Sequence, residues 1–372
     1  MKPKVMSDSM KRSPLAAIYK GVRLIQWVLI LMLILAVFQI QVTSSYSNLF
    51  IIIIIWLSYG LVTFMLIYLA WKFYVWFADN RNFFILAYLI AVVVLVSNVI
   101  ITITYTTQII LDQNEIVMKS IGHRNASSPE PIATIFFISI IITFATMWVA
   151  AAILLKNFTT LPKIKYWLLM SIPLIYYLTQ FQPYLFSIFS NYFLVDTVEF
   201  VVIYTIIFTA IEPIGGFLFG LAFWATSRKI ESAKIKDYLF ISGSGFMLFF
   251  VSNHAAVLVS YPFPPFGLIQ ICYLGLSSYL ILTGIHSSAI SVAQDDKLRH
   301  AIRESIDHQR SRFMEHIGTS EMSEIIYNRT FDLSKKLSMS MTKETNVSPS
   351  LTAEQVKDYI DEVMKERSMI DR

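Results

Sequence analysis

The chain has 372 residues, of which 56% are hydrophobic and 15% are charged, and its formal net charge is +5. Soluble globular domains carry about 25% charged residues, so this composition excludes a soluble domain and predicts a protein embedded in lipid. The one cysteine, Cys272, lies in an apolar run and excludes a disulfide within the chain.

Eight windows along the chain are long and apolar enough to cross a bilayer as helices, each needing about 20 residues. They cover approximately residues 24–43, 49–71, 83–106, 132–155, 166–190, 200–226, 238–260 and 266–291. Polar and apolar residues do not alternate in them, which argues against membrane strands. The sequence therefore predicts an all-α polytopic membrane protein with eight transmembrane helices. A basic segment, 1–23, precedes the membrane domain, 24–291, and a helical cytoplasmic tail, 292–372, follows it.

Basic residues flank the predicted spans almost entirely on one side. That side holds Lys2, Lys4, Lys11, Arg12, Lys20, Arg23, Lys72, Arg81, Lys156, Lys163, Lys165, Arg228, Lys229, Lys234 and Lys236. The opposite side holds Lys119 and Arg124. Since cytoplasmic loops carry the excess of Lys and Arg, we expect a cell-membrane protein with both termini in the cytoplasm.

Two halves of the membrane domain share short motifs. Val96-Ser97-Asn98 in the third span matches Val251-Ser252-Asn253 in the seventh, and the same offset brings Gly60 onto Gly215. This pattern favours a parallel tandem repeat of four plus four helices. Chance similarity between apolar segments is the alternative.

The sixth span contains the stretch FTAIEPIGGFLFG, with the one acidic residue near the middle of any span, Glu212. An ionisable group at that depth costs about 2.5–3.5 kcal/mol and normally faces protein or water, so we expect a protonated Glu212 that faces a neighbouring helix. Thr209, Glu212, Gly216 and Gly220 share one helical face. Gly216 and Gly220 form a GxxxG motif, which predicts close packing against another helix.

The seventh span offers polar partners for Glu212. Asn253 and His254 lie in its outer half, and with Thr209 they complete a candidate intramembrane polar site. Two interpretations remain open for this site: hydrogen bonds that hold helices together, or a site for a proton, substrate or ligand. No residue pattern predicts a catalytic group, a cofactor site or a metal site, and we expect neither enzymatic activity nor a nucleic-acid partner.

The tail changes abruptly to polar composition. No Gly or Pro occurs between the last span and Gly318, so we expect the eighth helix to continue to about residue 317, followed by a linker and a short helix over 353–367. Its sparse apolar stripe suits packing against a cytoplasmic signalling partner or against the tail of a second copy in a homo-oligomer.

The segments GIHSSAISVAQDDKLRHAIRES and SPSLTAEQVKDYIDEVMKE resemble uncharacterised multi-span membrane proteins of ammonia-oxidising archaea. The membrane part is similar to the sensor region of some archaeal histidine kinases. This resemblance implies a sensing role, although the tail carries neither a phospho-acceptor histidine motif nor ATP-binding glycine boxes.

The sequence is therefore compatible with three functions. The first is a receptor-like or signalling module that passes a cue through the eighth helix to a cytoplasmic partner. The second is a secondary transporter with Glu212 as its midplane substrate or proton site. The third is a structural subunit of a membrane complex.

Overall fold

The computed structural model describes residues 14–43, 48–116, 131–156, 162–179, 211–228, 230, 232–252, 264–294, 317–318, 320–322 and 324–326. The chain divides into two compact units, Met1–Ser288 and Ala289–Arg372. Over the described ranges the secondary structure is helical, without a strand.

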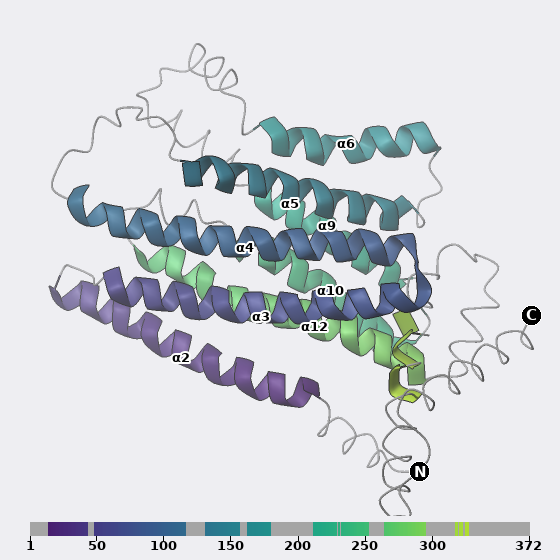
Figure 1. Ribbon diagram of the computed structural model, residues 1–372, viewed down its shortest axis with the longest axis horizontal. Coiled ribbons are helices and arrows are strands. Elements are labelled where there is room, and N and C mark those ends of the chain that lie inside the picture. The colour runs from purple at the N-terminus through teal and green to yellow at the C-terminus, as the bar shows by residue number, and fades with distance from the viewer. Residues whose placement is uncertain are drawn as a thin grey trace, which may run out of the picture. The chain divides into compact units, whose positions relative to one another are not determined.

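The first unit is built from long helices, several of which run side by side in Figure 1. They are α2 (Pro14–Thr43), α3 (Asn48–Asn80), α4 (Phe83–Ile116), α5 (Pro131–Lys156), α6 (Lys163–Thr179), α9 (Ile211–Arg228), α10 (Ala233–Ser252) and α12 (Pro264–Gln294). The last of these begins in the first unit and ends in the second.

Six helices of the described chain are long and apolar enough to cross a membrane. These spans are Lys20–Gln39, Leu49–Asp79, Phe83–Gln108, Pro131–Lys156, Ala233–Ser252 and Ile271–Ala293. They confirm the expected all-helical, multi-pass membrane protein. The predicted spans 166–190 and 200–226 are described only over α6 and α9, and their remaining residues lie outside the described part of the chain. The eight-span count therefore stays a prediction.

Local sequence signals explain where the helices begin. Pro14, Pro131 and Pro264 are the first residues of α2, α5 and α12, positions at which the missing N–H of proline costs nothing. Between α3 and α4, Arg81 adopts a positive φ of 42° and ends α3. Asn82 then caps α4, because its Oδ1 accepts a hydrogen bond from the Phe84 amide at 2.8 Å.

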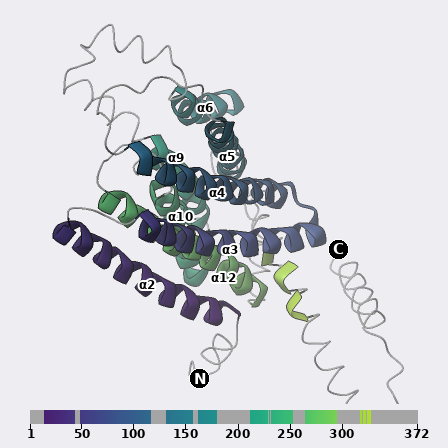
Figure 2. The ribbon, with the colours of Figure 1, turned by 60° about the vertical axis from the view of Figure 1, so that its left-hand side comes forward.

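Consecutive helices pack in antiparallel pairs (Figure 1 and Figure 2). In the α4–α5 pair, Asn98 Nδ2 donates to Ser139 Oγ at 2.9 Å, and Tyr105 stacks on Phe136 at a centroid distance of 4.3 Å. The start of α4 is therefore level with the end of α5. Thr106, 2% exposed on the same face of α4, has a buried Oγ1 without a hydrogen-bond partner.

A chain of buried rings crosses the first unit from α12 to α10. Successive centroids are 5.1–6.5 Å apart in the order His286, Trp76, Phe73, Tyr88, Phe223 and Phe246. Ring pairs at these distances add about 0.5–1.5 kcal/mol each to the stability gained from burial, so this row of rings connects five helices. It also sets the turn between α3 and α4 level with the C-terminal end of α9.

The basic residues of these helices gather at one end of the first unit. Arg81 lies in the α3–α4 turn, Lys156, Lys163 and Lys165 flank the α5–α6 connection, and Arg228, Lys234 and Lys236 flank the α9–α10 connection. Within the described residues, the opposite ends of α3, α4, α5 and α12 carry no Lys or Arg.

The two positions matched by the predicted repeat have different surroundings. Gly60 is exposed, and a Cβ there would meet no atom within 4 Å. Gly215 is buried against the Phe144 ring. Because Asn253 lies outside the described residues, the four-plus-four repeat stays a prediction.

The described part of the second unit contains a contact between the end of α12 and the later tail. A Cβ at Gly318 would lie 2.7 Å from Val292 Cβ and 3.5 Å from the Ala293 amide nitrogen. The expected continuation of the eighth helix over 295–316 lies outside the described residues. The expected linker and the helix over 353–367 lie outside the described residues.

Candidate functional site at the crossing of α9 and α10

The predicted site residues divide into those that the structure describes and those that it does not. Thr209, Asn253 and His254 lie outside the described residues. Glu212 lies in the first turn of α9, and the described structure gives the place of its backbone. Gly216 and Gly220 lie further along α9 and are both buried.

The two glycines of the GxxxG motif lie directly against α10. A Cβ at Gly220 would be 2.6 Å from the Gly243 carbonyl oxygen, and one at Gly243 would be 2.7 Å from the Gly220 carbonyl oxygen. A Cβ at Gly216 would be 3.0 Å from the Met247 carbonyl oxygen. These separations leave no room for a side chain, so the backbones of α9 and α10 touch at this crossing.

An aromatic contact reinforces the same crossing. Trp224 Nε1 donates to the Phe240 carbonyl at 3.2 Å, and the two rings stack with centroids 5.5 Å apart. A Cβ at Gly243 would also come within 2.7 Å of the Trp224 ring. Gly243 therefore makes room both for the α9 backbone and for this tryptophan.

The opposite face of α10 packs against α12, again through glycines. A Cβ at Gly245 would lie 2.8 Å from the Ile281 amide nitrogen. One at Gly284 would lie 2.6 Å from both Ser242 Cβ and the Tyr238 carbonyl oxygen. The Gly243-Ser-Gly245 segment, to which the sequence assigned no role, thus places α10 in backbone contact with α9 and with α12.

The register of the crossing locates Glu212 along α10. Gly220 is opposite Gly243, and Gly216, four residues earlier, is opposite Met247, four residues later. One more turn of this antiparallel register brings position 212 level with Val251, beside the buried Ser252. Position 212 therefore lies on the helical face that the glycines share and at the level of a buried serine.

The other side of α9 faces α5. Phe219 contacts Phe144 of α5 at a centroid distance of 5.4 Å, and it also contacts Phe250 of α10 at 4.7 Å. Phe144 also stacks on Tyr177 of α6 at 3.6 Å. Helix α9 thus packs against α10 on its glycine face and against α5 through Phe219, while Ile214 and Phe217 are exposed.

Two buried basic side chains lie outside the predicted site. Lys72 is 7% exposed and His286 is 3% exposed. The His286 ring lies 6.1 Å from Tyr68 and 6.5 Å from Trp76, centroid to centroid. The spacing of Tyr68, Lys72 and Trp76, four residues apart on one face of α3, is the sequence signal that could have identified this cluster.

The described residues contain no group of three or more His, Cys, Asp or Glu side chains that could hold a metal ion. No protein-family model, curated protein or solved structure matches the chain.

We expect Gly220→Leu to destabilise the protein by about 1–3 kcal/mol, because the added side chain would separate α9 from α10. Gly60→Leu is the matched control, since the space at Gly60 is open. Thermal unfolding of both variants in detergent or nanodiscs measures the difference. Equal stability of the two variants would show that the crossing does not need a glycine.

Proposed function

We propose that the chain is a multi-pass membrane signalling module that passes a cue through α12 to a cytoplasmic partner. The observation that carries this proposal is that α12 is one uninterrupted helix shared by both compact units, Met1–Ser288 and Ala289–Arg372. A displacement along or about the axis of α12 in the membrane domain is then also a displacement of the residues that open the second unit.

The contacts of α12 in the first unit couple it to its neighbours. Gln26 Nε2 of α2 donates to the Cys272 carbonyl at 3.2 Å, and the Ser58 hydroxyl of α3 donates to the Ile271 carbonyl. On the side of α10, Gly245 and Gly284 allow backbone contact. Because a packed interface has few alternative arrangements, a change in α2, α3 or α10 biases the position of α12.

Within the second unit, the contact between Gly318 and Val292 is where a displacement of α12 would reach the later tail. The last turns of α12 carry Val292 and Ala293, and the later tail packs on them. The resemblance of the membrane part to archaeal kinase sensor regions favours the same role. The tail would recruit the output protein, in keeping with its lack of kinase motifs.

For the topology we propose eight spans, in a four-plus-four arrangement, with both termini cytoplasmic. The clustering of basic residues at one end of the described helices supports this orientation. In a background with Cys272→Ser, a membrane-impermeant maleimide should label Ser127→Cys in intact cells and Ser348→Cys only after lysis. The opposite labelling pattern would contradict the proposed orientation.

The signalling proposal predicts that a variant of the tail contact changes partner binding. We expect Gly318→Leu to reduce capture of the native cytoplasmic partner while leaving membrane insertion intact, because leucine cannot fit against Val292. Crosslinking of the full-length protein in native membranes, followed by mass spectrometry, measures this capture.

Gly21→Leu is the control for that experiment, since a Cβ at Gly21 meets nothing within 4 Å. A captured kinase or response regulator supports signalling. Unchanged capture by Gly318→Leu would contradict a role for the tail contact.

The second candidate function is secondary transport with Glu212 as the midplane substrate or proton site. The register of the α9–α10 crossing favours it, because position 212 lies level with the buried Ser252. An ionisable residue at a helix interface within the membrane commonly marks an ion or proton path.

Two substitutions separate these interpretations of Glu212. Glu212→Gln preserves shape and hydrogen-bonding capacity but cannot titrate, whereas Glu212→Leu removes the polar group. If Glu212 is a proton or substrate site, Glu212→Gln should express normally and lose uptake into reconstituted vesicles or its pH dependence. A Gln variant that is active and pH-responsive would leave Glu212 a structural role, with Glu212→Leu alone destabilising the helices.

A further inference from the structure

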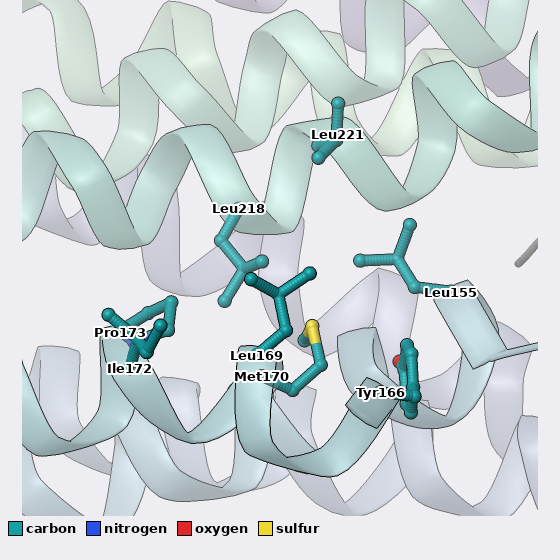
Figure 3. A pocket seen from close by; sticks show the side chains of 8 residues that line it. All are labelled: Leu155, Tyr166, Leu169, Met170, Ile172, Pro173, Leu218 and Leu221. Carbon is teal, nitrogen blue, oxygen red and sulfur yellow. The ribbon is translucent and has the colours of Figure 1, made fainter. Parts of the chain in front are cut away.

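An apolar crevice of about 310 Å³ opens between α5, α6 and α9 (Figure 3). Its walls include Leu155 of α5, Leu169, Met170 and Pro173 of α6, and Leu218 and Leu221 of α9. The crevice is too small for another helix, whose diameter with side chains is about 10–12 Å. Its volume and apolar lining suit a length of hydrocarbon chain.

The lining excludes water and polar ligands as occupants. No charged residue lines the crevice, and the one hydroxyl, that of Tyr166, already donates to the Ala152 carbonyl. Apolar cavities of this kind stay dry and take apolar molecules. Leu169 and Ile172 are 54% and 55% exposed, so the crevice opens on the outer face of helices that lie in lipid.

The way in which α6 is attached explains why the crevice exists. Trp148 Nε1 donates to the Met170 carbonyl at 2.8 Å, and the Tyr177 hydroxyl donates to the Ile140 carbonyl at 3.3 Å. These bonds hold α6 to α5 beside Pro173, whose ring interrupts the regular hydrogen bonding of α6. Helix α6 meets α9 with bulky side chains and no glycine contact, which leaves space between them.

Basic residues lie at one end of the crevice. Lys163 precedes Tyr166 and Met170 on one face of α6, and Lys165 precedes Leu169 and Ile172 on the adjacent face. Both lysines are exposed, and the first turn of α6 contains no acidic residue. Lys156 ends α5 and Arg228 ends α9 at the same end.

We propose that this crevice is a binding site for one anionic phospholipid. One of its two acyl chains occupies the apolar crevice, and its phosphate headgroup lies at the membrane surface among Lys163, Lys165 and Arg228. A neutral or zwitterionic lipid would fill the crevice equally well but would gain less at the headgroup. Basic clusters between membrane helices select anionic headgroups for this reason.

The test uses the full-length protein in phosphatidylcholine nanodiscs that contain a trace of phosphatidylglycerol with a photoactivatable group in its acyl chain. Mass spectrometry after irradiation should locate the label on peptides that contain Met170 or Leu218, and unlabelled phosphatidylglycerol should compete for it. Lys163→Ala/Lys165→Ala should weaken this competition about 10- to 30-fold. Lys234→Ala/Lys236→Ala, an exposed pair with the same spacing at the start of α10, should not.

A second pair of variants tests the chain within the crevice. Leu169→Trp should fill it and remove the label, whereas Leu168→Trp, at a neighbouring position that is 68% exposed, should retain it. Labelling that is unchanged in Leu169→Trp would overturn the proposal. So would equal labelling by a phosphatidylcholine probe together with no effect of Lys163→Ala/Lys165→Ala, because the lipid would then only surround the helices.

Discussion

The backbone contact of α10 with α9 on one face and with α12 on the other is the constraint on which the membrane domain depends. Between helices in lipid, apolar side chains gain little by leaving their surroundings, so association relies on close packing and hydrogen bonds. Gly220 and Gly243 bring two backbones together, and Gly245 and Gly284 do the same on the opposite face of α10. Contact with α10 therefore fixes the positions of both α9 and α12.

The ring chain from His286 to Phe246 is compatible only with this spacing. Phe223 of α9 must reach both Tyr88 of α4 and Phe246 of α10, which requires α9 to lie close to α10. The same arrangement links α12 to several helices at once. The proposed signalling role and the proposed transport role therefore both depend on the packing around α10. In signalling, α12 would move; in transport, Glu212 of α9 would bind a proton or a substrate.

Helix α6 shows a different way of packing in the same domain. It is held to α5 by aromatic side chains that donate to backbone carbonyls, with Trp148 beside the proline that disturbs the helix. Such bonds fix a helix without requiring close contact along its length. The domain thus combines tight glycine contacts around α10 with a looser attachment of α6, beside which the apolar crevice opens.

The sequence by itself determined the membrane class, the helical fold and the positions of six of the spans, because a long apolar run in lipid has to satisfy its own backbone hydrogen bonds. It also singled out Gly216 and Gly220 by their spacing. It did not show that Gly243 and Gly245 face different helices, that Lys72 and His286 are buried, or that Gly60 and Gly215 differ in surroundings. Only the tertiary structure decided these points, because helices that are apolar on every side carry no periodic signal for which face meets a neighbour and which meets lipid.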